Sequence, residues 1–510
     1  MANQKFQNRT LFFGDNLEVL RKKIPDESFD LIYLDPPFNS NRDYNVLFKE
    51  GKVDSPAQIV AFEDSWHWTE EADKIFNELV GVKKSETEIN ETISNLMLAL
   101  ERLIGKNDVL AYLVMMTIRL IELKRILKNT GSIYLHCDPT ASHYLKIVMD
   151  AVFGKKNFRN EIIWHYKRWT AASNRFQRMH DIIFWYTKTD KYIFTKPLQP
   201  YSNPEWVEDT VRGIVKGKLV RLKNEAGEYI KRQKENLGVL MHDVWEDINF
   251  IPPTSKERLG YATQKPEALL ERIIKASSNE GDWILDPFCG CGTTVAVSEK
   301  LNRKWVGIDI TTLAINLIKH RINAQFRDKQ FKILVDGLPK DISGAKALFK
   351  KDPFEFEYWA LDLVSAMPSQ SKTKEKMRGA DKGIDGIISF VKGSNNGDFT
   401  YGRIVVQVKG GGVQRKDIAT LKGDIEREKA DGGLFITLEE PTKPMIEEAV
   451  KSGKFKIPLI ATEFPKIQIL TIKDLLSGKK IILPLGAEPY YKKAKKVEIY
   501  NFKPNNHFTF

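Results

Sequence analysis

The segment WILDPFCGCGTT, residues 283–294, decides the fold. Its apolar start has the composition of a buried strand, and the glycines at positions 290 and 292 predict a tight turn. We expect a helix over residues 293–301 and a second strand over residues 305–309. This order of strand, turn, helix and strand predicts a βαβ unit in a parallel sheet.

A second unit of the same kind is predicted near the start of the chain. Residues 11–15 (LFFGD) predict a short strand and a turn, residues 16–23 a helix, and residues 29–34 (FDLIYL) a strand that ends at Asp35. Further strands are expected at residues 131–136, 162–164 and 182–186, and helices at residues 70–128, 142–152 and 266–278. Two βαβ units predict a doubly wound α/β domain.

Composition limits the class of protein. The chain of 510 residues is too long for one ordinary domain, and its net charge of +12 suits a polyanionic partner or simply a basic surface. The three cysteines, Cys137, Cys289 and Cys291, fit neither a disulfide framework nor a four-ligand zinc site. No apolar run reaches the roughly 18 residues of a membrane span. We therefore expect a protein of the reducing cytoplasm with no membrane association.

The glycine turn predicts a nucleoside site. Glycine lets the backbone approach a ligand closely, and the N-terminus of the following helix offers free N–H groups to a carboxylate. Asp309 ends the next strand, where an acid accepts ribose hydroxyls in nucleotide-binding sheets. A plain turn is the alternative, but the order of strand, turn, helix, strand and acid favours a bound nucleoside.

The sequence Asp35-Pro36-Pro37-Phe38 predicts a binding site for an amino group. The two prolines fix φ and remove two backbone donors, so the Asp35 carboxylate and the Pro36 carbonyl form a rigid pair of acceptors. The exocyclic amine of a flipped-out base needs such acceptors, and Phe38 offers a face for its ring. A turn that merely closes the strand would not explain why an acid and an aromatic residue arrive together.

Taken together, these motifs resemble the β-class DNA amino-methyltransferases over about residues 8–325. The resemblance includes Gly14-Asp15-Asn16-Leu17 and Thr263-Gln264-Lys265-Pro266. It implies a Rossmann-like, S-adenosyl-L-methionine-dependent methyltransferase domain over residues 1–340 that acts on double-stranded DNA. An inserted target-recognition region, rich in basic and aromatic residues, would occupy about residues 167–260.

The resemblance also implies roles for individual residues. Asp35, Pro36, Pro37 and Phe38 would be catalytic. The cofactor would be held by Asp15, Lys265, Asp286, Phe288, Gly290, Gly292, Thr293 and Asp309, with Asp15 on its adenine and Lys265 near its methionine end. In this family Asp at the first catalytic position is usual for N6-adenine enzymes and Ser for N4-cytosine enzymes. Asp35 thus points to adenine, and N4-cytosine is the alternative.

A second domain is expected at residues 353–485, after a linker at 341–352 and before a basic tail at 486–510. In it Gly383-Ile384-Asp385-Gly386 precedes a strand, RIVVQVK, at residues 403–409. Gln407 and Lys409 share one face of that strand because side chains alternate with period two. An acid beside an oxygen acceptor and a lysine is a minimal arrangement for Mg²⁺-assisted phosphodiester hydrolysis.

This pattern resembles the PD-(D/E)xK nuclease fold, and more closely the Mrr-like restriction endonucleases, in which Gln replaces the second acid. The resemblance implies that Asp385, Gln407 and Lys409 are catalytic and that Asp385 and Gln407 bind the metal. Glu357 would be an upstream acidic ligand, with Glu355 as the alternative. A domain of this fold that only grips DNA is the competing interpretation.

The sequence as a whole predicts modification and restriction activity in one chain. Two alternatives remain: a solitary methyltransferase whose C-terminal domain only binds DNA, and a non-catalytic nucleic-acid-binding protein that keeps a cofactor fold as scaffold. The recognition sequence and the oligomeric state, including a homodimer, are left open. So is the question of whether Trp66, Trp68, Trp164 and Trp169 line a base pocket or merely pack.

Overall fold

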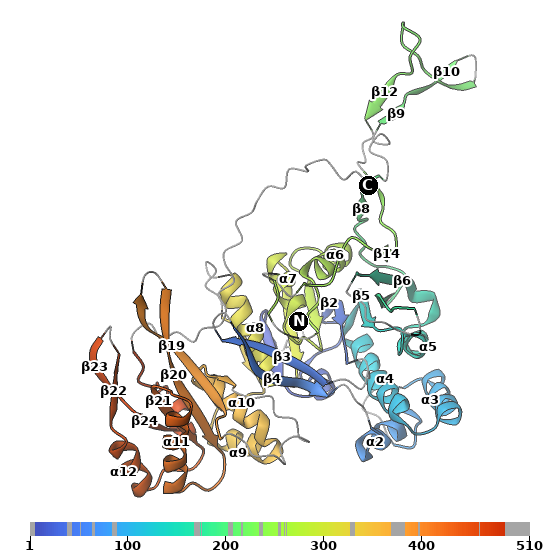
Figure 1. The fold of residues 1–510 in the computed structure, drawn as a ribbon. Coiled ribbons are helices and arrows are strands. Elements are labelled where there is room, and N and C mark those ends of the chain that lie inside the picture. Colours follow the sequence, from blue (N-terminus) through green and yellow to red (C-terminus); the bar gives the residue numbers. More distant parts are fainter. Residues whose placement is uncertain are drawn as a thin grey trace.

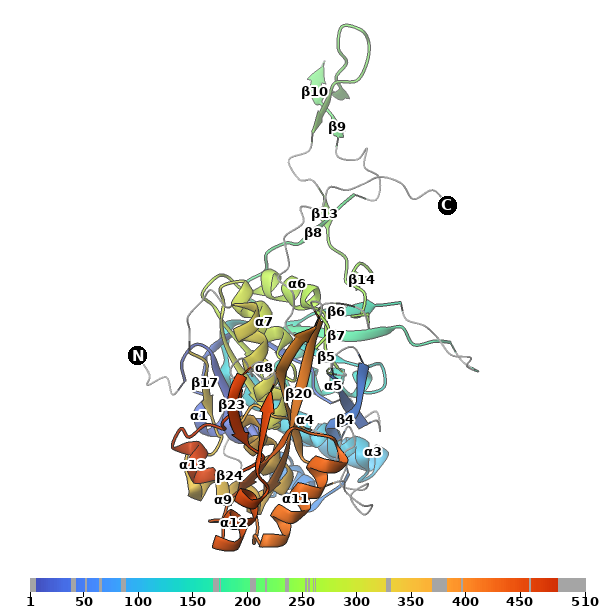
Figure 2. The ribbon, with the colours of Figure 1, turned by 60° about the vertical axis from the view of Figure 1, so that its left-hand side comes forward.

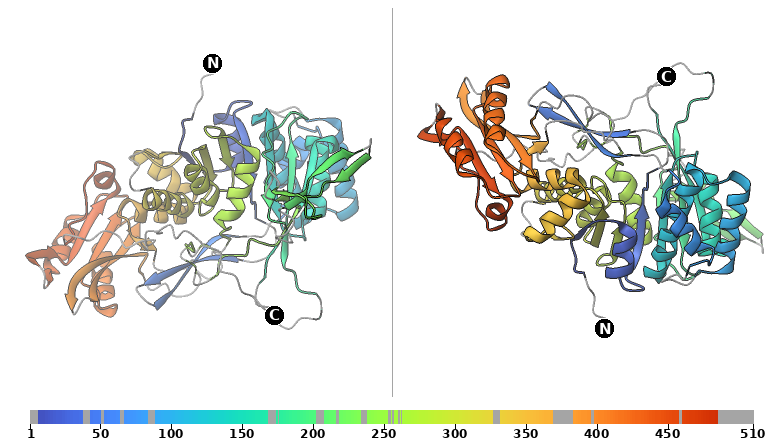
Figure 3. Two further views of the ribbon diagram at one scale, coloured as in Figure 1. Left: turned by 90° about the horizontal axis from the view of Figure 1, so that it is seen from above. Right: turned by 90° about the horizontal axis from the view of Figure 1, so that it is seen from below.

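Two α/β domains, each built around its own sheet, succeed one another along the chain (Figure 1). The computed structural model describes residues 6–37, 43–50, 53–63, 67–83, 89–167, 174, 176–201, 208–215, 218–233, 238–252, 255, 257–259, 261, 263–326, 332–368, 383–395, 398–457 and 460–484. Views from above and below place the C-terminal domain at one end of the molecule and the helices of residues 70–126 at the other (Figure 3). Phe38, Trp66, Trp169 and the expected basic tail lie outside the described residues.

The N-terminal domain contains a nine-stranded sheet with the order β14-β6-β7-β5-β2-β15-β16-β1-β17. Its strands, in chain order, are β1 (Thr10–Phe13), β2 (Phe29–Leu34), β5 (Leu127–Cys137), β6 (Phe158–His165), β7 (His180–Thr187), β14 (Val244–Trp245), β15 (Trp283–Asp286), β16 (Lys304–Asp309) and β17 (Leu334–Asp336). All neighbours pair in parallel except β7, which runs antiparallel to both β5 and β6. The expected doubly wound, largely parallel sheet is confirmed.

Helices cover both faces of this sheet because buried strands expose alternate side chains to opposite sides. On β2, Ile32 and Leu34 belong to one core, whereas Leu31 and Tyr33 belong to another. The first core is closed by α1 (Asn16–Lys23), α2 (Glu70–Leu79), α3 (Glu91–Ile104), α4 (Asp108–Ile126) and α5 (Ser142–Phe153). The opposite face is closed by α6 (Glu267–Ser277), α7 (Thr293–Lys300) and α8 (Thr312–Gln325).

The region expected to recognise DNA contains short antiparallel strand pairs that extend away from the sheet (Figures 1 and 2). The pairs are β8 (Leu198–Gln199) with β13 (Val239–Leu240), β9 (Glu208–Thr210) with β12 (Lys231–Gln233), and β10 (Arg212–Val215) with β11 (Lys218–Arg221). A further hairpin, β3 (Asp43–Glu50) with β4 (Val53–Glu63), follows the motif that begins at Asp35. Sequence analysis did not anticipate this hairpin, and it supplies no strand to the nine-stranded sheet.

The C-terminal domain is built on a five-stranded sheet with the order β18-β19-β20-β21-β24. These strands are β18 (Met367–Pro368), β19 (Gly386–Asn395), β20 (Asp398–Lys409), β21 (Gly432–Thr437) and β24 (Ile467–Thr471). The remaining elements are a pair formed by β22 (Lys454–Ile457) and β23 (Ile460–Pro465), and the helices α9 (Ile342–Lys351), α10 (Pro353–Leu363), α11 (Arg415–Arg427), α12 (Lys443–Lys451) and α13 (Ile472–Leu476). The expected small α/β domain is present.

The expected linker at residues 341–352 differs from what the structure contains. Residues 342–351 form helix α9, which begins at the side-chain cap of Asp341. Ala345 is fully buried in the C-terminal core, and Leu348 and Phe349 pack against the same core. The lysines and glycine that suggested a linker lie on a helix whose apolar side is buried, so this segment is part of the C-terminal domain.

None of the helices in the described part of the chain is long and apolar enough to cross a membrane.

The central strand β15 offers a direct test of this core. Leu285 is completely buried between β2 and β16, so Leu285→Ala should lower the free energy of unfolding of the N-terminal domain by about 2–5 kcal/mol. Urea unfolding followed by tryptophan fluorescence measures this loss. Leu103→Ala is the matched control, because Leu103 is 75% exposed and its truncation should change stability by less than about 0.5 kcal/mol. Equal effects of the two substitutions would contradict the placement of β15.

Candidate functional site

A cavity of about 240 Å³ lies at one edge of the nine-stranded sheet. The neighbouring strands β2, β15, β16 and β1 are parallel, so their carboxyl ends meet at the same edge. Asp35 comes directly after β2, Asp286 ends β15, Asp309 ends β16, and Asp15 comes closely after β1. All four carboxylates line the cavity. The sequence motifs that carry these four acids, although far apart along the chain, therefore form one site.

The remaining site residues fall into three groups. Pro36, Pro37, Lys265, Phe288, Gly290 and Thr293 line the cavity. Gly292 stands just behind its wall, at the start of α7, and Phe38 lies outside the described residues. Gly292 has a φ of +73°, and a Cβ there would lie 2.6 Å from Ile318 Cγ1. Glycine is needed at this position because both the backbone conformation and the packing exclude a side chain.

Asp35 uses its two carboxylate oxygens differently. Lys265 Nζ donates a hydrogen bond of 2.5 Å to Asp35 Oδ2. Oδ1 is buried and accepts no hydrogen bond from any residue that the structure describes. A buried acceptor without a donor is costly, so this oxygen is available to a ligand that brings an N–H group. Lys265, expected near the methionine end of a cofactor, here contacts the Asp35 carboxylate, which the sequence predicts to be catalytic.

Asp309 joins the glycine turn to the start of α8. Its Oδ2 accepts from Gly290 N at 2.9 Å, and its Oδ1 accepts from both N and Oγ1 of Thr311 at 2.9 Å each. Burial raises the pKa of Asp309 above its usual range. The carboxylate is thus fixed at the end of β16, lines the cavity and retains acceptor capacity beyond these bonds.

Asp15 is fixed by a local cap and by a buried arginine. Its Oδ1 accepts from Leu17 N at 2.8 Å, which caps α1, and Arg119 donates to its Oδ2 at 2.7 Å. Arg119 also donates to Asn16 Oδ1 at 2.5 Å and lines the cavity. Sequence analysis missed Arg119, although a lone charge inside the apolar run of residues 110–121 was a usable signal.

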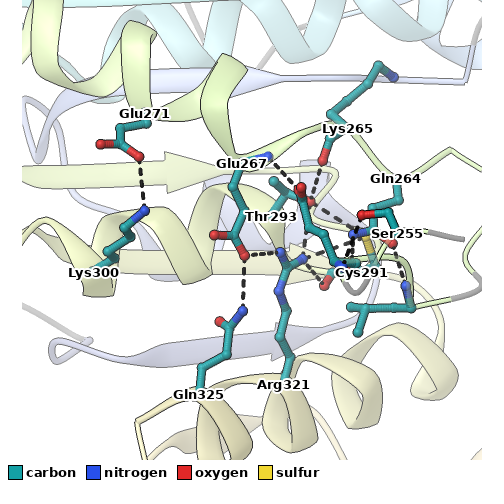
Figure 4. Close-up of polar contacts among 12 residues, drawn as sticks. Ser255, Gln264, Lys265, Glu267, Glu271, Cys291, Thr293, Lys300, Arg321 and Gln325 are labelled. Atoms are coloured by element: carbon teal, nitrogen blue, oxygen red, sulfur yellow. Dashed lines mark hydrogen bonds and ion pairs between the residues drawn. The ribbon is translucent and has the colours of Figure 1, made fainter. Parts of the chain in front are cut away.

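The loop that carries Lys265 is held against the glycine turn by α8 (Figure 4). Arg321 of α8 donates to Cys291 O and to Thr293 Oγ1, each at 3.1 Å, and to Glu267 Oε1 at 2.8 Å. Thr293 Oγ1 donates to Lys265 O at 3.2 Å. Arg321 is therefore the link between the loop of Lys265 and the turn before Thr293, which are 28 residues apart, and no sequence pattern had singled it out.

A row of buried polar side chains continues from the cavity across the sheet. Tyr33, which lines the cavity, shares a hydrogen bond of 2.8 Å with His136 Nδ1. His136 Nε2 lies 3.1 Å from Asp181 Oδ2, and Tyr166 donates to Asp181 Oδ1 at 3.0 Å. These bonds fix the end of β2 relative to β5, β7 and the start of the recognition region at residue 167.

The open question about the tryptophans is answered for two of them. Trp164 is buried, donates to Ile248 O at 2.7 Å and packs on Tyr166. Trp68 packs on Phe76 beneath the Lys106 ammonium group. Neither lines the cavity, so both have a packing role.

The nuclease motif residues of the C-terminal domain also come together. Asp385 Oδ2 accepts from Val408 N at 2.7 Å, which places this acid beside the strand that carries Gln407 and Lys409. Gln407 Oε1 is buried and has no hydrogen-bond partner in the described residues. Lys409 Nζ donates to Asp417 Oδ1 of α11 at 3.1 Å. Asp385 and Gln407 thus offer neighbouring oxygen donors, the ligand type that Mg²⁺ prefers.

The acidic residues considered as further metal ligands lie in different places. Glu355 is bound to Thr312 at the start of α8, which places it at the boundary with the N-terminal domain. Glu357 lies on α10, which packs against β20. Asp424 was missed: its buried Oδ2 lies 3.0 Å from where a Cβ of Gly383 would stand, next to the turn that carries Asp385. Within the described residues, no cluster of three or more His, Cys, Asp or Glu side chains has a metal-binding arrangement.

Comparison with known families identifies both regions. Residues 29–320 match the family model described as DNA methylase, and this match covers more than half of the 510 residues. The chain belongs to the DNA methylase family. Residues 348–465 match the family model described as restriction endonuclease. The expectation of a DNA methylase region followed by a restriction-endonuclease region is confirmed.

The individual relatives of this chain are distant in sequence. Type II methyltransferase M.BamHI of Bacillus amyloliquefaciens is 29% identical over 326 residues, which cover 63% of this chain and 58% of that protein. DNA adenine methyltransferase YhdJ of Escherichia coli K12 is 27% identical over 317 residues, covering 62% of this chain and 83% of that protein. The chain spans 58%, 57% and 57% of the first three curated relatives.

Solved structures give matches of the same extent. The M1.HpyAVI–SAM complex is 16% identical, covers 62% of this chain and 98% of that chain, and has a TM-score of 0.34. The PvuII DNA methyltransferase, described as cytosine-N4-specific, is 15% identical, covers 64% of this chain and 90% of that chain, and has a TM-score of 0.35.

Asp286 generates a prediction about pH. Burial raises its pKa to about 7, well above the value near 4 of an unfolded chain, so the folded state binds more protons between these pH values. Its contribution to stability therefore falls as pH rises from about 4 to about 7 and is constant above that. Asp286→Asn removes this loss, so the melting temperature of the variant relative to the unaltered chain should rise with pH over the same window. A difference that does not change with pH would contradict the raised pKa.

Proposed function

We propose that the N-terminal domain transfers a methyl group from S-adenosyl-L-methionine to the exocyclic N6 of adenine in double-stranded DNA. The observation that carries this proposal is Asp35 Oδ1, a buried acceptor at the cavity that has no donor among the described residues. An amino group of an extruded base supplies the donor that this oxygen lacks. Membership in the DNA methylase family supports the same reaction.

The cavity has features that suit the cofactor. The glycine turn and the N-terminus of α7 present backbone N–H groups, while Asp309 has acceptor capacity for ribose hydroxyls. Phe288 and Ile310 add apolar surface for a flat ring. When bound, S-adenosylmethionine would supply the methyl group that is transferred to the amino nitrogen, which would release one proton to solvent in exchange.

Within that reaction Asp35 acts as an acceptor and not as a nucleophile. Its Oδ1 accepts a hydrogen bond from the amino group, which draws the nitrogen toward a pyramidal geometry and directs its lone pair. Lys265 holds Oδ2 at 2.5 Å, so the carboxylate keeps one orientation while Oδ1 engages the base. Pro36 and Pro37 fix the backbone that carries it, which limits the reorganisation needed when the base enters.

Adenine is favoured over cytosine by the first position of the catalytic motif. Asp35 occupies the place where adenine-specific relatives usually have Asp and cytosine-specific relatives Ser. The relative YhdJ, whose name specifies adenine, matches over 83% of its length. Transfer to N4 of cytosine is the alternative, because the same acceptor would serve either amine.

Contacts to DNA are proposed for the strand pairs of residues 208–233. Arg212, Lys218 and Arg221 lie on β10 and β11, and Arg221 and Lys223 lie 5.9 and 5.0 Å from the ring of Tyr229. Basic side chains interleaved with an aromatic ring suit phosphate contact and base stacking. The pairs project from the sheet, where they could track a duplex whose flipped base enters the cavity (Figure 2).

For the C-terminal domain we propose Mg²⁺-dependent hydrolysis of the DNA backbone. Asp385 and Gln407 would hold the metal through their side-chain oxygens, with Glu357 as a third ligand, and the buried unpaired Gln407 Oε1 supports this assignment. Bound Mg²⁺ would lower the charge of the phosphodiester under attack. Lys409, held by Asp417, would orient the attacking water. Methylation of the shared site would then protect it from cleavage.

The methyl-transfer proposal predicts a specific loss in Asp35→Asn. In the amide only the oxygen can accept a hydrogen bond, whereas the carboxylate has one oxygen for Lys265 and another for the amino group of the base. We therefore expect kcat to fall by roughly 10²-fold or more. Transfer of labelled methyl groups to unmethylated genomic DNA, with mass spectrometry of the nucleosides, measures the rate and identifies the base. Asp26→Asn is the matched control, since Asp26 precedes the same strand at its opposite end and its side chain is 72% exposed. An unchanged rate in Asp35→Asn would refute the assignment, and N4-methylcytosine as product would refute the choice of adenine.

The nuclease proposal predicts that Lys409→Ala abolishes Mg²⁺-dependent cutting and leaves methyl transfer intact. Lys416→Ala, at an exposed position on α11, is the control and should cut normally. Agarose-gel assays of unmethylated and pre-methylated DNA measure both cutting and protection. If the unaltered chain cuts nothing with any divalent metal, the domain either only binds DNA or needs a partner, and the proposal that this chain cuts by itself is refuted. Equal cutting of methylated and unmethylated DNA would refute the proposed protection.

A further inference from the structure

Helix α10 of the restriction-endonuclease region packs against both domains. Phe356, Trp359 and Ala360 are buried in the core of its own domain. Its other side lies on α8 of the DNA methylase region, through Glu355 and Asp362. The two sets occupy different sides of the helix: positions 355 and 362 are about two turns apart and share one side, whereas positions 356, 359 and 360 cluster on an adjacent side. One helix is therefore part of both domains' packing.

Glu355 reaches the cofactor edge of the methylase sheet. Its Oε2 accepts from Thr312 N and from Thr312 Oγ1, each at 2.9 Å. Thr312 is the first residue of α8, and the residue before it, Thr311, binds Asp309 Oδ1 through its own N–H and hydroxyl groups. Only the Thr311–Thr312 peptide thus separates Glu355 from the carboxylate expected to accept the ribose hydroxyls.

Tyr358 makes a second contact one turn later. It packs against a small cluster formed by Tyr261 and Cys291, and also against the main core of its own domain. Tyr261 and Cys291 line the cavity, and a Cβ on Gly290 would lie 3.2 Å from the Tyr261 ring. The wall of the cofactor cavity is therefore supported from behind by a residue of the other domain.

The α8 helix connects these contacts to the rest of the site. It starts at Thr312, and further along the helix Arg321 holds the glycine turn and Glu267 in place (Figure 4). A shift of α8 would therefore move Asp309 and the loop of Lys265 together. Glu355 opposes such a shift at the N-terminus of α8, where a carboxylate also interacts favourably with the helix dipole.

Burial makes this contact sensitive to removal. The Glu355 carboxyl lies in the interface, and burial raises its pKa to about 7, although Thr312 donates two hydrogen bonds to it. Without the carboxylate, the N–H and hydroxyl groups of Thr312, which is completely buried, would lose their shared acceptor. An unsatisfied buried donor is costly, so α8 would move to find another acceptor.

We propose that Glu355 is a positioning residue of the S-adenosylmethionine site, supplied by the restriction-endonuclease region to the methylase region. The inference rests on the proposed function, because it assumes that the cavity binds this cofactor. Coupling between sites is reciprocal, so cofactor binding in turn stabilises the contact between α8 and α10. The two regions are thus joined by a structural unit whose stability depends on the cofactor.

The test is the affinity of the full-length chain for S-adenosylmethionine, measured by isothermal titration calorimetry. Glu355→Ala should weaken binding roughly tenfold, since both hydrogen bonds that hold the N-terminus of α8 are lost. Glu355→Gln should recover most of the affinity, because its amide oxygen accepts the same two bonds. Asp362→Asn is the matched control: it removes the 3.3 Å ion pair to Lys319 in the same interface but two turns away from Thr312, and should bind normally.

A double-substitution cycle separates positioning from general damage to the interface. If Glu355 acts through Asp309, then Glu355→Ala should cost much less affinity in an Asp309→Asn background than in the unaltered chain. Additive losses would overturn the inference. Should Glu355→Ala fail to fold, Thr312→Val provides the same test, because it removes one donor to Glu355 and should weaken binding several-fold.

The outcomes distinguish this inference from the function on which it rests. If the unaltered chain does not bind S-adenosylmethionine, the proposed function fails and this inference with it. If the unaltered chain binds the cofactor and Glu355→Ala binds equally well, only the inference fails. Equal weakening by Asp362→Asn would show a general interface effect and would also overturn it.

Discussion

Parallel pairing of β2, β15, β16 and β1 brings the carboxyl ends of four strands to one edge of the sheet, and the site is formed by the residues at and just beyond those ends. The pairing is possible because each strand is buried on both faces, between α1–α5 on one side and α6–α8 on the other. The register of the strands then determines which side chains meet. Asp35 and Asp286 are neighbours only because Leu285 pairs with Ile32.

Four carboxylates at one edge of the sheet need hydrogen-bond donors or positive charges close by, because a buried acid without them is unfavourable. Backbone N–H groups of the glycine turn and of α1 supply some of them, and Arg119 and Lys265 supply more. Among these four carboxylates, the oxygen left buried and unpaired in the described residues is Asp35 Oδ1. The geometry of the site thus leaves an open acceptor where an amino group would enter.

Contact between the two regions depends on the same need to satisfy buried groups. The N-terminus of α8 has donors that its own helix cannot use, and Glu355 of α10 accepts them. Residues 342–351, expected as a linker, form a helix instead because Ala345 and Leu348 have a core to pack against. The methylase region is therefore followed directly by helices of the next domain, and α10 among them packs against α8 of the methylase region.

The sequence by itself determined the two βαβ units with their strands and helices, the turn at residues 290–292 and the acids at the ends of β2, β15 and β16. These features depend on local patterns, namely apolar runs, glycine positions and strand ends. Only the tertiary structure decided the partner of Lys265, the roles of Arg119 and Arg321, and the contact of Glu355 with α8. Those contacts join residues 30 to 230 positions apart, and no local pattern encodes which distant donor a buried acceptor will meet.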